Sequence, residues 1–362
     1  MSSHDAIPAP GGEHASAGGG HYPAHTPKAP RVAGVEFIGT GSYLPEDKIT
    51  NAGLERIMDT TDEWIVQRTG IRERRKADPA KHESAWTMAS GALENALADA
   101  RIPADQLDLI IVATVSSEMA TPSVASRIAN RLKAGKAAAF DLAAACSGWV
   151  YGLNVAHEMI RGGGITTAAV IGTEHLTQYM DYSTAGRGCA ILFGDGAGAA
   201  VLRRAADPAK GAIAWSMHGD GTGWKDLYIP RRPDDLPEGT DPAAVKMGQM
   251  FMNGREVFKF AVGTFQSLIA ETLDKAGVRA ESVAHFVCHQ SNVRILEAAR
   301  ERFGIPQDKL YVNIHRVGNT SAASVPICFD ELRRAGRIHP GDKVMFLAFG
   351  AGLTWSSSLW QF

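Results

Sequence analysis

The sequence has no long uninterrupted run of apolar residues. A helix needs about 20 such residues to cross the hydrocarbon core of a bilayer, so we predict no transmembrane helix and no membrane partner. Charge of one sign is also lacking, because 37 Lys and Arg residues face 39 Asp and Glu residues and leave a formal net charge of −2. Bulk electrostatics therefore gives no support to a nucleic-acid partner, and we expect none.

Cysteine is scarce, and none of the four cysteines belongs to a C-x-x-C pair. This pattern argues against zinc ribbons and thioredoxin-like redox motifs. A chain of 362 residues is long enough to bury a core without disulfides. We therefore expect reduced thiols in a cytoplasmic protein that needs neither a metal nor another cofactor.

Residues 1–31 are rich in Ala, Gly and Pro and contain no apolar run. A secretory signal peptide requires such a run, so we expect none here. The segment buries too little apolar surface to offset chain entropy, and we predict a disordered tail. Its histidines, His4, His14, His21 and His25, are interpreted as solvated residues in preference to an adventitious metal site.

From residue 32 onward, apolar strand-like runs alternate with segments of helical periodicity. Residues 107–115, for example, are almost continuously apolar, which is typical of a strand covered on both faces. The alternation predicts an α/β fold. It recurs in residues 32–205 and in residues 206–362, so we predict two similar halves. Residues 219–246 are predicted to form surface loops.

The segment Gly194 to Ala199 fits the pattern G-x-G-x-x-A of a dinucleotide-binding loop. Such a loop must lead directly into a helix, whose N-terminus meets the pyrophosphate. Apolar residues of strand character follow instead, and we predict strands at 189–193 and 199–202. We interpret the glycines between them as a hairpin turn that uses positive φ angles, and we expect no NAD site.

Three polar residues stand at predicted strand ends, where α/β sheets place their ligand sites. Cys146 follows a short strand and precedes a helix, His289 ends a strand at 284–288, and Asn319 follows a strand predicted at 310–314. Each alone has an ordinary interpretation: a buried structural cysteine, a cap or a turn residue. At a helix N-terminus, however, the pKa of Cys146 is expected to fall, which favours the reactive thiolate.

Six segments together resemble the β-ketoacyl-acyl carrier protein synthase III family of the thiolase superfamily, and the resemblance extends from residue 32 to residue 362. They are Gly-Thr-Gly-Ser-Tyr-Leu-Pro (39–45), Thr-Asp-Glu-Trp-Ile-Val-Gln-Arg-Thr-Gly-Ile-Arg-Glu-Arg (61–74), Ala-Ala-Ala-Cys-Ser-Gly (143–148), Phe-Gly-Asp-Gly-Ala-Gly-Ala (193–199), His-Gln-Ser-Asn (289–292) and Gly-Asn-Thr-Ser-Ala-Ala-Ser-Val-Pro (318–326). The resemblance implies a five-layered αβαβα fold, a homodimer and a Cys–His–Asn centre. It also implies an acyltransferase that joins an acyl-CoA primer to malonyl-acyl carrier protein and initiates type II fatty acid synthesis.

The same resemblance assigns roles to individual positions. Cys146 would carry the acyl group, and His289 and Asn319 would donate hydrogen bonds to the malonyl thioester oxygen. The backbone N–H groups of Cys146 and Ala351 would bind the acyl-cysteine carbonyl. Glycine is usual in the family at the position of Ala351, and proline is common at that of Cys288.

Further positions match the family's substrate contacts. Trp64 and Arg187 would sandwich the adenine of CoA, Arg68 would meet phosphate, Gly254 lies at a position near the pantetheine, and Phe258 would border the site. A cationic surface for the acidic carrier protein would include Lys259, Arg294 and Arg302, although Glu301 stands where lysine is frequent. Thr121 would come from the partner subunit to cap the acyl pocket. Because threonine is smaller than the phenylalanine often found there, we expect primers longer than acetyl.

Three alternatives remain open at this point. The first is a related condensing enzyme of secondary metabolism. The second is a Cys–His–Asn hydrolase, although no hydrolase signature is present. The third is a non-catalytic relative that binds carrier protein, against which the complete Cys–His–Asn set argues.

Overall fold

A computed structural model describes residues 33–362 of the chain. The tail predicted over residues 1–31 and its four histidines lie outside the described residues. Within 33–362, no helix combines the length and apolarity needed to cross a membrane. The same part of the chain contains no group of three or more His, Cys, Asp or Glu side chains arranged to hold a metal ion.

The first sheet has five strands in the order β1-β7-β6-β4-β5. Strand β4 pairs in parallel with β5 and β6, whereas β7 is antiparallel to both β6 and β1. The strands are β1 (Gly34–Tyr43), β4 (Leu109–Ala113), β5 (Ala138–Leu142), β6 (Thr167–Glu174) and β7 (Gly196–Ala205).

The second sheet has four strands in the order β11-β12-β13-β8. Its pairings are parallel between β11 and β12 and antiparallel from β12 to β13 and from β13 to β8. The strands are β8 (Gly211–Gly219), β11 (His285–Cys288), β12 (Lys343–Gly350) and β13 (Thr354–Gln361). In the first sheet, the four strands β4-β6-β7-β1 follow the same sequence of pairings: one parallel pair and then two antiparallel pairs. Such a recurrence is what two similar halves would produce, while the boundary at residues 205 and 206 stays a prediction.

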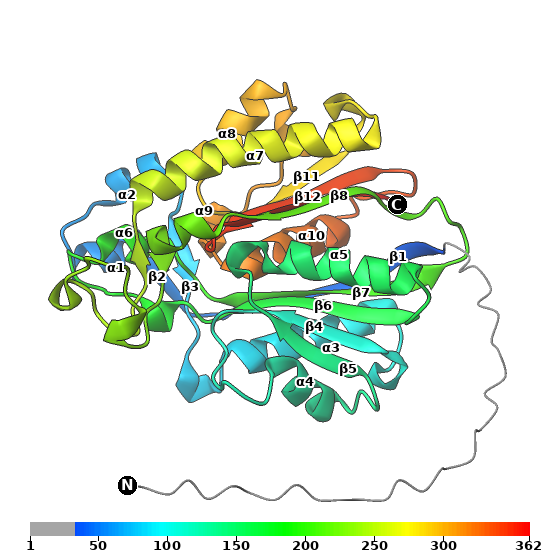
Figure 1. The fold of residues 1–362 in the computed structure, drawn as a ribbon, viewed down its shortest axis with the longest axis horizontal. Coiled ribbons are helices and arrows are strands. Elements are labelled where there is room, and N and C mark those ends of the chain that lie inside the picture. Colours follow the sequence, from blue (N-terminus) through cyan, green and yellow to red (C-terminus); the bar gives the residue numbers. More distant parts are fainter. Residues whose placement is uncertain (1–32) are drawn as a thin grey trace, which may run out of the picture. The chain divides into compact units, whose positions relative to one another are not determined.

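Helices and sheets form five layers (Figure 1). Helices α3 and α4 cover one face of the first sheet, α5 and α10 lie between the sheets, and α7 and α8 cover the far face of the second sheet. Their bounds are α3 (Ala85–Ala100), α4 (Val124–Leu132), α5 (Gly148–Arg161), α7 (Gly254–Ala276), α8 (Val293–Arg302) and α10 (Ser324–Arg334). One apolar core fills both inner boundaries, around α5 and α10, and a separate core fills each outer boundary. The predicted five-layered thiolase-like fold is confirmed.

Short elements surround the ends of the two sheets. They are β2 (Lys48–Thr50), α1 (Asn51–Glu55), α2 (Asp62–Thr69), β3 (Glu73–Arg75), α6 (Arg187–Ala190), β9 (Leu227–Tyr228), β10 (Phe251–Met252) and α9 (Ile314–Val317). Strand β9 pairs with β10, so part of the segment predicted as surface loop is a small sheet.

Local sequence explains several of these elements. All five residues of β4 are buried, as expected of a strand that arises from a continuous apolar run. Helix α8 begins after Asn292, whose side chain accepts a hydrogen bond from the backbone nitrogen of Arg294 at 2.9 Å. Helix α7 ends at Gly277, which adopts φ 64° in the left-handed region.

The glycine-rich segment 194–199 differs from its prediction. No strand forms at 189–193, where α6 occupies residues 187–190, and no hairpin turn follows. Gly194, Gly196 and Gly198 also avoid positive φ. The glycines allow close packing instead. A β-carbon on Gly198, for example, would lie only 2.7 Å from the backbone nitrogen of Ile327 in α10. The expected strand at 310–314 is likewise reduced to one bridge, between Leu310 and Phe286.

Candidate active site

The three polar residues singled out in the sequence lie around one cavity. Cys146 belongs to a 3₁₀ turn between β5 and α5, His289 directly follows β11, and Asn319 lies between α9 and α10. All three line a cavity of about 120 Å³, here named the His–Asn cavity. Gly254 and Phe258 of α7 line the same cavity. The predicted convergence of distant segments is therefore present in the fold.

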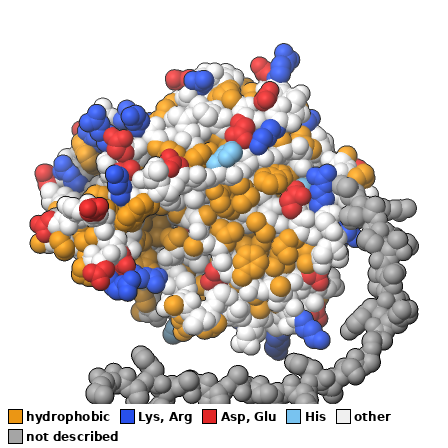
Figure 2. All heavy atoms as spheres, viewed as in Figure 1, with side chains coloured by type: hydrophobic (Ala, Val, Ile, Leu, Met, Phe, Trp, Pro, Cys, Tyr) orange, Lys and Arg blue, Asp and Glu red, His pale blue; other side chains and the backbone are white. Residues whose placement is uncertain are grey.

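A second cavity of about 270 Å³, here named the Tyr179 cavity, also borders the cysteine. Its lining includes Tyr179, Ser321 and Ala351 together with apolar side chains of the 227–229 segment. Cys146 lines both cavities, so it lies at their junction. In the space-filling view, apolar side chains spread across the middle of the face and continue into a hollow at its left (Figure 2).

Close backbone packing fixes the position of Cys146. Ala145 adopts φ 45°, an unusual angle for a residue with a side chain. Gly350, at the end of β12, lies directly against the cysteine. The Ser147 hydroxyl donates a hydrogen bond to the Thr354 carbonyl at 3.0 Å. The cysteine turn is therefore held against β12 and β13 of the second sheet.

The predicted lowering of the Cys146 pKa is wrong. Burial raises the pKa of the thiol to about 12 from 9.0, while contact with the Ser321 hydroxyl lowers it and the nearby Glu174 carboxylate raises it further. A helix N-terminus contributes about 2 kcal/mol at most, or about 1.5 pKa units. Desolvation therefore outweighs the helix, and the resting residue is a thiol.

His289 is buried, and its Nδ1 lies 2.7 Å from the Ser324 hydroxyl. The Phe349 ring packs edge-on against the imidazole, with a centroid separation of 5.4 Å. Burial lowers the pKa of His289 to about 3, so the ring is neutral at physiological pH. Among residues 33–362, no acceptor takes a hydrogen bond from Nε2.

The Asn319 amide is oriented by its neighbours. Its Oδ1 accepts a hydrogen bond from the Ser321 backbone nitrogen at 2.9 Å, and its backbone joins Leu192 and Gly194 through two further bonds. With Oδ1 engaged, Nδ2 is the donor that remains, and within the described chain it has no protein acceptor. Its two hydrogens are thus available to a substrate oxygen.

Two backbone donors lie beside the sulfur. In residues 33–362, neither the N–H of Cys146 nor that of Ala351 donates to another residue. Ala351 avoids positive φ, so alanine fits the position where glycine is usual in the family. Both groups could donate hydrogen bonds to an oxyanion.

The predicted nucleotide contacts form one aromatic–cationic cluster on α2 and α6. The guanidinium carbons of Arg68 and Arg187 lie 4.6 Å and 5.1 Å from the centre of the Trp64 ring. Arg187 also approaches the Asp59 carboxylate at 3.5 Å. A planar base would have to enter between Trp64 and Arg187.

The remaining predicted positions are on the surface. Lys259 of α7 and Arg294 and Arg302 of α8 are exposed on two helices that pack together, and Glu301 is exposed beside them. Cys288 is buried in β11, as expected of a structural thiol, and burial raises its pKa.

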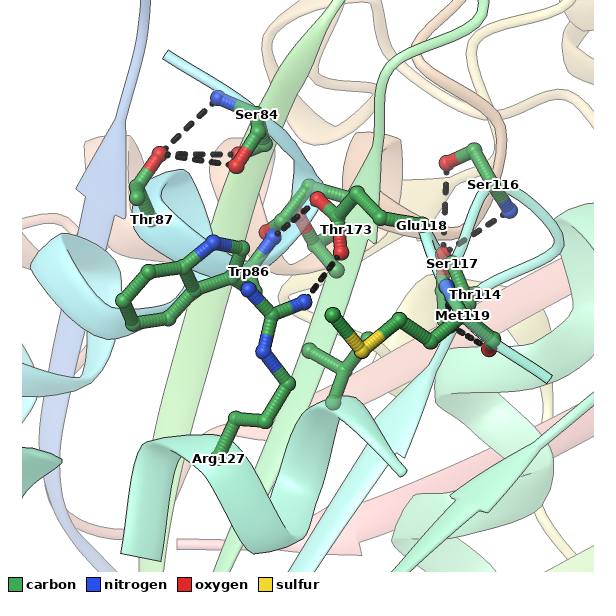
Figure 3. Close-up of polar contacts among 12 residues, drawn as sticks. Ser84, Trp86, Thr87, Thr114, Ser116, Ser117, Glu118, Met119, Arg127 and Thr173 are labelled. Atoms are coloured by element: carbon green, nitrogen blue, oxygen red, sulfur yellow. Dashed lines mark hydrogen bonds and ion pairs between the residues drawn. The ribbon is translucent and has the colours of Figure 1, made fainter. Parts of the chain in front are cut away.

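Thr121 is exposed and lines neither cavity of its own chain. It belongs to the loop that leads into α4. The Glu118 carboxylate anchors this loop, because it accepts from the Trp86 backbone nitrogen at 3.1 Å and from Arg127 at 2.8 Å (Figure 3). The Arg127 guanidinium stacks 4.4 Å from the Trp86 ring centre.

Sequence reasoning missed a buried carboxylate behind the cysteine. Glu174, the last residue of β6, is fully buried and contacts hydroxyl groups of Thr114, Ser116 and Ser321. A signal was present, because Glu174 ends a long apolar strand just as the other three residues stand at strand ends.

Known proteins share this architecture. Residues 140–221 match the protein family described as "3-Oxoacyl-[acyl-carrier-protein (ACP)] synthase III". Residues 273–362 match the family that describes the C-terminal part of the same enzyme. The β-ketoacyl-[acyl-carrier-protein] synthase III of Caldanaerobacter subterraneus is 45% identical over 323 residues, which cover 89% of this chain and 96% of that protein.

Solved structures agree with the sequence matches. The 3-oxoacyl-[acyl-carrier-protein] synthase III of Aquifex aeolicus superposes with a TM-score of 0.83 at 41% identity, covering 91% of this chain and all of that one. The priming β-ketosynthase of the R1128 polyketide pathway gives 0.84 at 34% identity, covering 93% and 98%. Together with the fold, these matches show that the chain belongs to the β-ketoacyl-[acyl-carrier-protein] synthase III family.

Proposed function

We propose that this protein condenses an acyl-CoA primer with malonyl-acyl carrier protein, with loss of CO₂, to give 3-oxoacyl-acyl carrier protein. The observation that carries the proposal is the location of Cys146 between two cavities, with His289 and Asn319 lining one of them. An acyl group on the sulfur can occupy the Tyr179 cavity while the second substrate approaches from the His–Asn cavity. Initiation of type II fatty acid synthesis is the role that the family resemblance supports.

The first half-reaction transfers the acyl group to the enzyme. Cys146 attacks the acyl-CoA thioester, a new thioester forms on the sulfur, and CoA leaves. The free N–H groups of Cys146 and Ala351 support this step, because both can hydrogen-bond the carbonyl oxygen as negative charge develops on it.

The second half-reaction forms the carbon–carbon bond. Decarboxylation of the malonyl group puts negative charge on its thioester oxygen, and the enolate attacks the acyl-cysteine carbonyl. Asn319 Nδ2 and His289 Nε2–H would both donate to that oxygen. The histidine donates from Nε2 in the tautomer whose Nδ1 accepts from the Ser324 hydroxyl, a contact of 2.7 Å. The same hydroxyl also lies 2.8 Å from the Ser321 carbonyl, so this tautomer requires the serine proton to turn from that carbonyl to Nδ1. No metal or other cofactor is needed for either step.

Binding of CoA would use the Trp64 cluster, with the adenine stacked between the indole and Arg187 and with Arg68 near phosphate. Gly254 and Phe258 border the His–Asn cavity, in keeping with contacts to the pantetheine. The exposed Lys259, Arg294 and Arg302 would meet the acidic carrier protein.

A homodimer is proposed because β5 is an edge strand of the first sheet and several large apolar side chains are exposed on the surface. Phe140 of β5, Met159 of α5 and Trp215 of β8 are each at least 37% exposed. Exposed edges and apolar patches are characteristic association sites. In such a dimer Thr121 of one subunit would cap the Tyr179 cavity of the other.

The size of that cavity supports primers longer than acetyl. A buried apolar cavity of roughly 150 Å³ already accommodates benzene, and the Tyr179 cavity has about 270 Å³.

A related role in secondary metabolism is the second candidate, because the R1128 priming ketosynthase is similar over nearly the whole chain. The test is to supply an acyl-CoA together with malonyl-acyl carrier protein or with malonyl-CoA, and to measure CO₂, free CoA and the 3-oxoacyl product. We expect one CO₂ and one CoA per product, with the carrier-bound extender preferred. Continuous release of CoA without a malonyl substrate would instead identify a hydrolase.

A further inference from the structure

The thiol of Cys146 presents a chemical problem that the Cys–His–Asn centre leaves unsolved. Its pKa of about 12 keeps it protonated at neutral pH, so a proton must leave the sulfur when the acyl group is attacked. His289 is a poor acceptor for this proton, because burial lowers its pKa to about 3. Another group beside the sulfur has to take it.

Glu174 lies close behind the cysteine and has no other assigned role. Its carboxyl group is completely buried at the end of β6. Its Oε2 accepts a 2.6 Å hydrogen bond from the Ser116 hydroxyl and longer contacts from Thr114 Oγ1 at 3.4 Å and the Val115 nitrogen at 3.3 Å. Thr114 and Ser116 lie at the base of the loop that carries Thr121 (Figure 3). These uncharged donors hold the carboxyl in place without an ion pair.

Ser321 connects this carboxyl to the active centre. Its hydroxyl donates to Glu174 Oε1 at 3.1 Å, and its side chain lines the Tyr179 cavity together with Cys146, whose pKa this hydroxyl lowers. Its backbone nitrogen holds Asn319 Oδ1 at 2.9 Å. The residue adopts φ 49°, a strained conformation for serine. While its proton points toward Glu174, the serine oxygen can accept the thiol proton. When the hydroxyl turns toward the sulfur it stabilises the thiolate, which is why it lowers the pKa of Cys146.

We propose that Glu174 accepts the Cys146 proton through the Ser321 hydroxyl and stores it while the cysteine is acylated. This inference rests on the acyl-cysteine mechanism proposed above. Ser321 lines the Tyr179 cavity but not the His–Asn cavity, and Glu174 lines neither, so both are relay and positioning residues.

The proton balance closes over the full cycle. During acylation the S–C bond forms, the C–S bond to CoA breaks, the thiol proton moves to Ser321 Oγ and the serine proton moves to Glu174. CoA leaves as a thiolate and takes a proton from solvent. After decarboxylation the enolate attacks the acyl-cysteine, and Cys146 is expelled as a thiolate. It then recovers the stored proton from Glu174 through Ser321, and both groups return to their starting states.

The electrostatic surroundings suit a proton that must be accepted and returned. Burial raises the pKa of Glu174 to about 7, whereas the hydrogen bonds from Ser116, Val115, Ser321 and Thr114 lower it. The titratable groups that face it are the Cys146 thiol and the Tyr179 hydroxyl. In the described part of the chain, no Lys, Arg or His forms an ion pair with Glu174.

The test measures the acylation half-reaction alone, by rapid quench with octanoyl-CoA and mass spectrometry of the intact enzyme between pH 5 and pH 9. In the unmodified protein the rate should rise with one ionisation near pH 7. Glu174→Gln and Ser321→Ala should remove this dependence and lower the rate at pH 8 at least about 100-fold, as expected for loss of general base catalysis. Thr173→Val, one residue away in β6, removes a buried hydrogen bond to Ala85 without touching the relay and should behave like the unmodified protein.

Ser116→Ala distinguishes a relay from a purely structural role. Loss of its bond to Oε2 destabilises the ionised carboxylate, so the rise in rate should move to higher pH. Alkylation of Cys146 by iodoacetamide, followed over the same pH range, gives a second measurement that needs no acyl substrate. An unchanged pH profile in Glu174→Gln, with Cys146 still acylated, would overturn the relay and leave the proposed function standing. Absence of an adduct on Cys146 in the unmodified protein with both acetyl-CoA and octanoyl-CoA would overturn the proposed function itself.

Discussion

Gly350 and Cys146 approach each other so closely that a β-carbon on residue 350 would lie 2.7 Å from the backbone nitrogen and 3.1 Å from the β-carbon of the cysteine. Gly350 ends β12 of the second sheet, and Cys146 follows β5 of the first. The absence of a side chain at position 350 therefore sets where the sulfur lies relative to His289, which follows the neighbouring strand β11.

Gly350→Ala should displace the cysteine turn and abolish most of the activity. Backbone contacts below 3.0 Å force a shift, and a displacement of about 1 Å can cost about 100-fold in rate. Steady-state condensation measures the loss, and circular dichroism checks that the fold survives. Gly263→Ala in α7 is the matched control, because a β-carbon there meets nothing within 4 Å. Near-normal activity of Gly350→Ala would show that the close approach is unimportant.

Trp64→Ala should raise the KM for acyl-CoA roughly tenfold with little change in kcat, because stacking of a base on an aromatic ring contributes about 1–3 kcal/mol. The same variant should use acyl-N-acetylcysteamine thioesters normally, since these lack the nucleotide. Trp86→Ala is the control, because Trp86 also carries a stacked arginine but belongs to α3 and takes no part in the Trp64 cluster on α2 and α6. Equal effects on both kinds of thioester would argue against nucleotide stacking at Trp64.

Thr121→Phe should shift the primer preference toward acetyl. If Thr121 caps the acyl cavity of a partner subunit, the larger ring overfills that space at about 1–3 kcal/mol, which corresponds to roughly a tenfold slower reaction of C8–C12 primers. Acetyl-CoA turnover serves as the internal control. An exclusive preference of the unmodified protein for acetyl-CoA would refute the expectation of longer primers.

Glu174→Gln should change how stability depends on pH. Burial raises the pKa of Glu174 from 4.5 to about 7, so the native state holds this proton more tightly than the unfolded state does. The free energy of unfolding therefore falls as pH rises from about 4.5 to 7 and is constant above that range. The difference between variant and unmodified protein should grow by on the order of 3 kcal/mol across this window. Urea unfolding at pH 5 and pH 8 measures it, and a difference independent of pH would mean that Glu174 is ionised throughout.

The sequence predicted those features that local pattern or family motifs determine. Continuous apolar runs identified β4 and β6, and strand ends followed by polar residues drew attention to Cys146 and His289. Features that depend on contacts between distant segments were not predictable. Burial of Cys146 reversed the expected shift of its pKa, and the glycines at 194–198 proved to allow close packing, that of Gly198 against α10, rather than a turn.

Elements with weak local signals were also misjudged. The segment at 310–314 contributes only one bridge to its sheet, between Leu310 and Phe286. The short helix α9 already begins at Ile314, the last residue of the segment. The cluster of Glu174, Ser116 and Ser321 comes from three separate segments. No single stretch of sequence contains enough of it to be recognised.

The most direct test of the account is mass spectrometry of peptides from the protein after a brief incubation with octanoyl-CoA. We expect one octanoyl group per chain, carried by Cys146, with Cys189, Cys288 and Cys328 unmodified and no adduct in Cys146→Ala. Addition of malonyl-acyl carrier protein should discharge the group as 3-oxodecanoyl-acyl carrier protein. An acyl group on another residue, or a product formed by Cys146→Ala at the normal rate, would contradict the central claim.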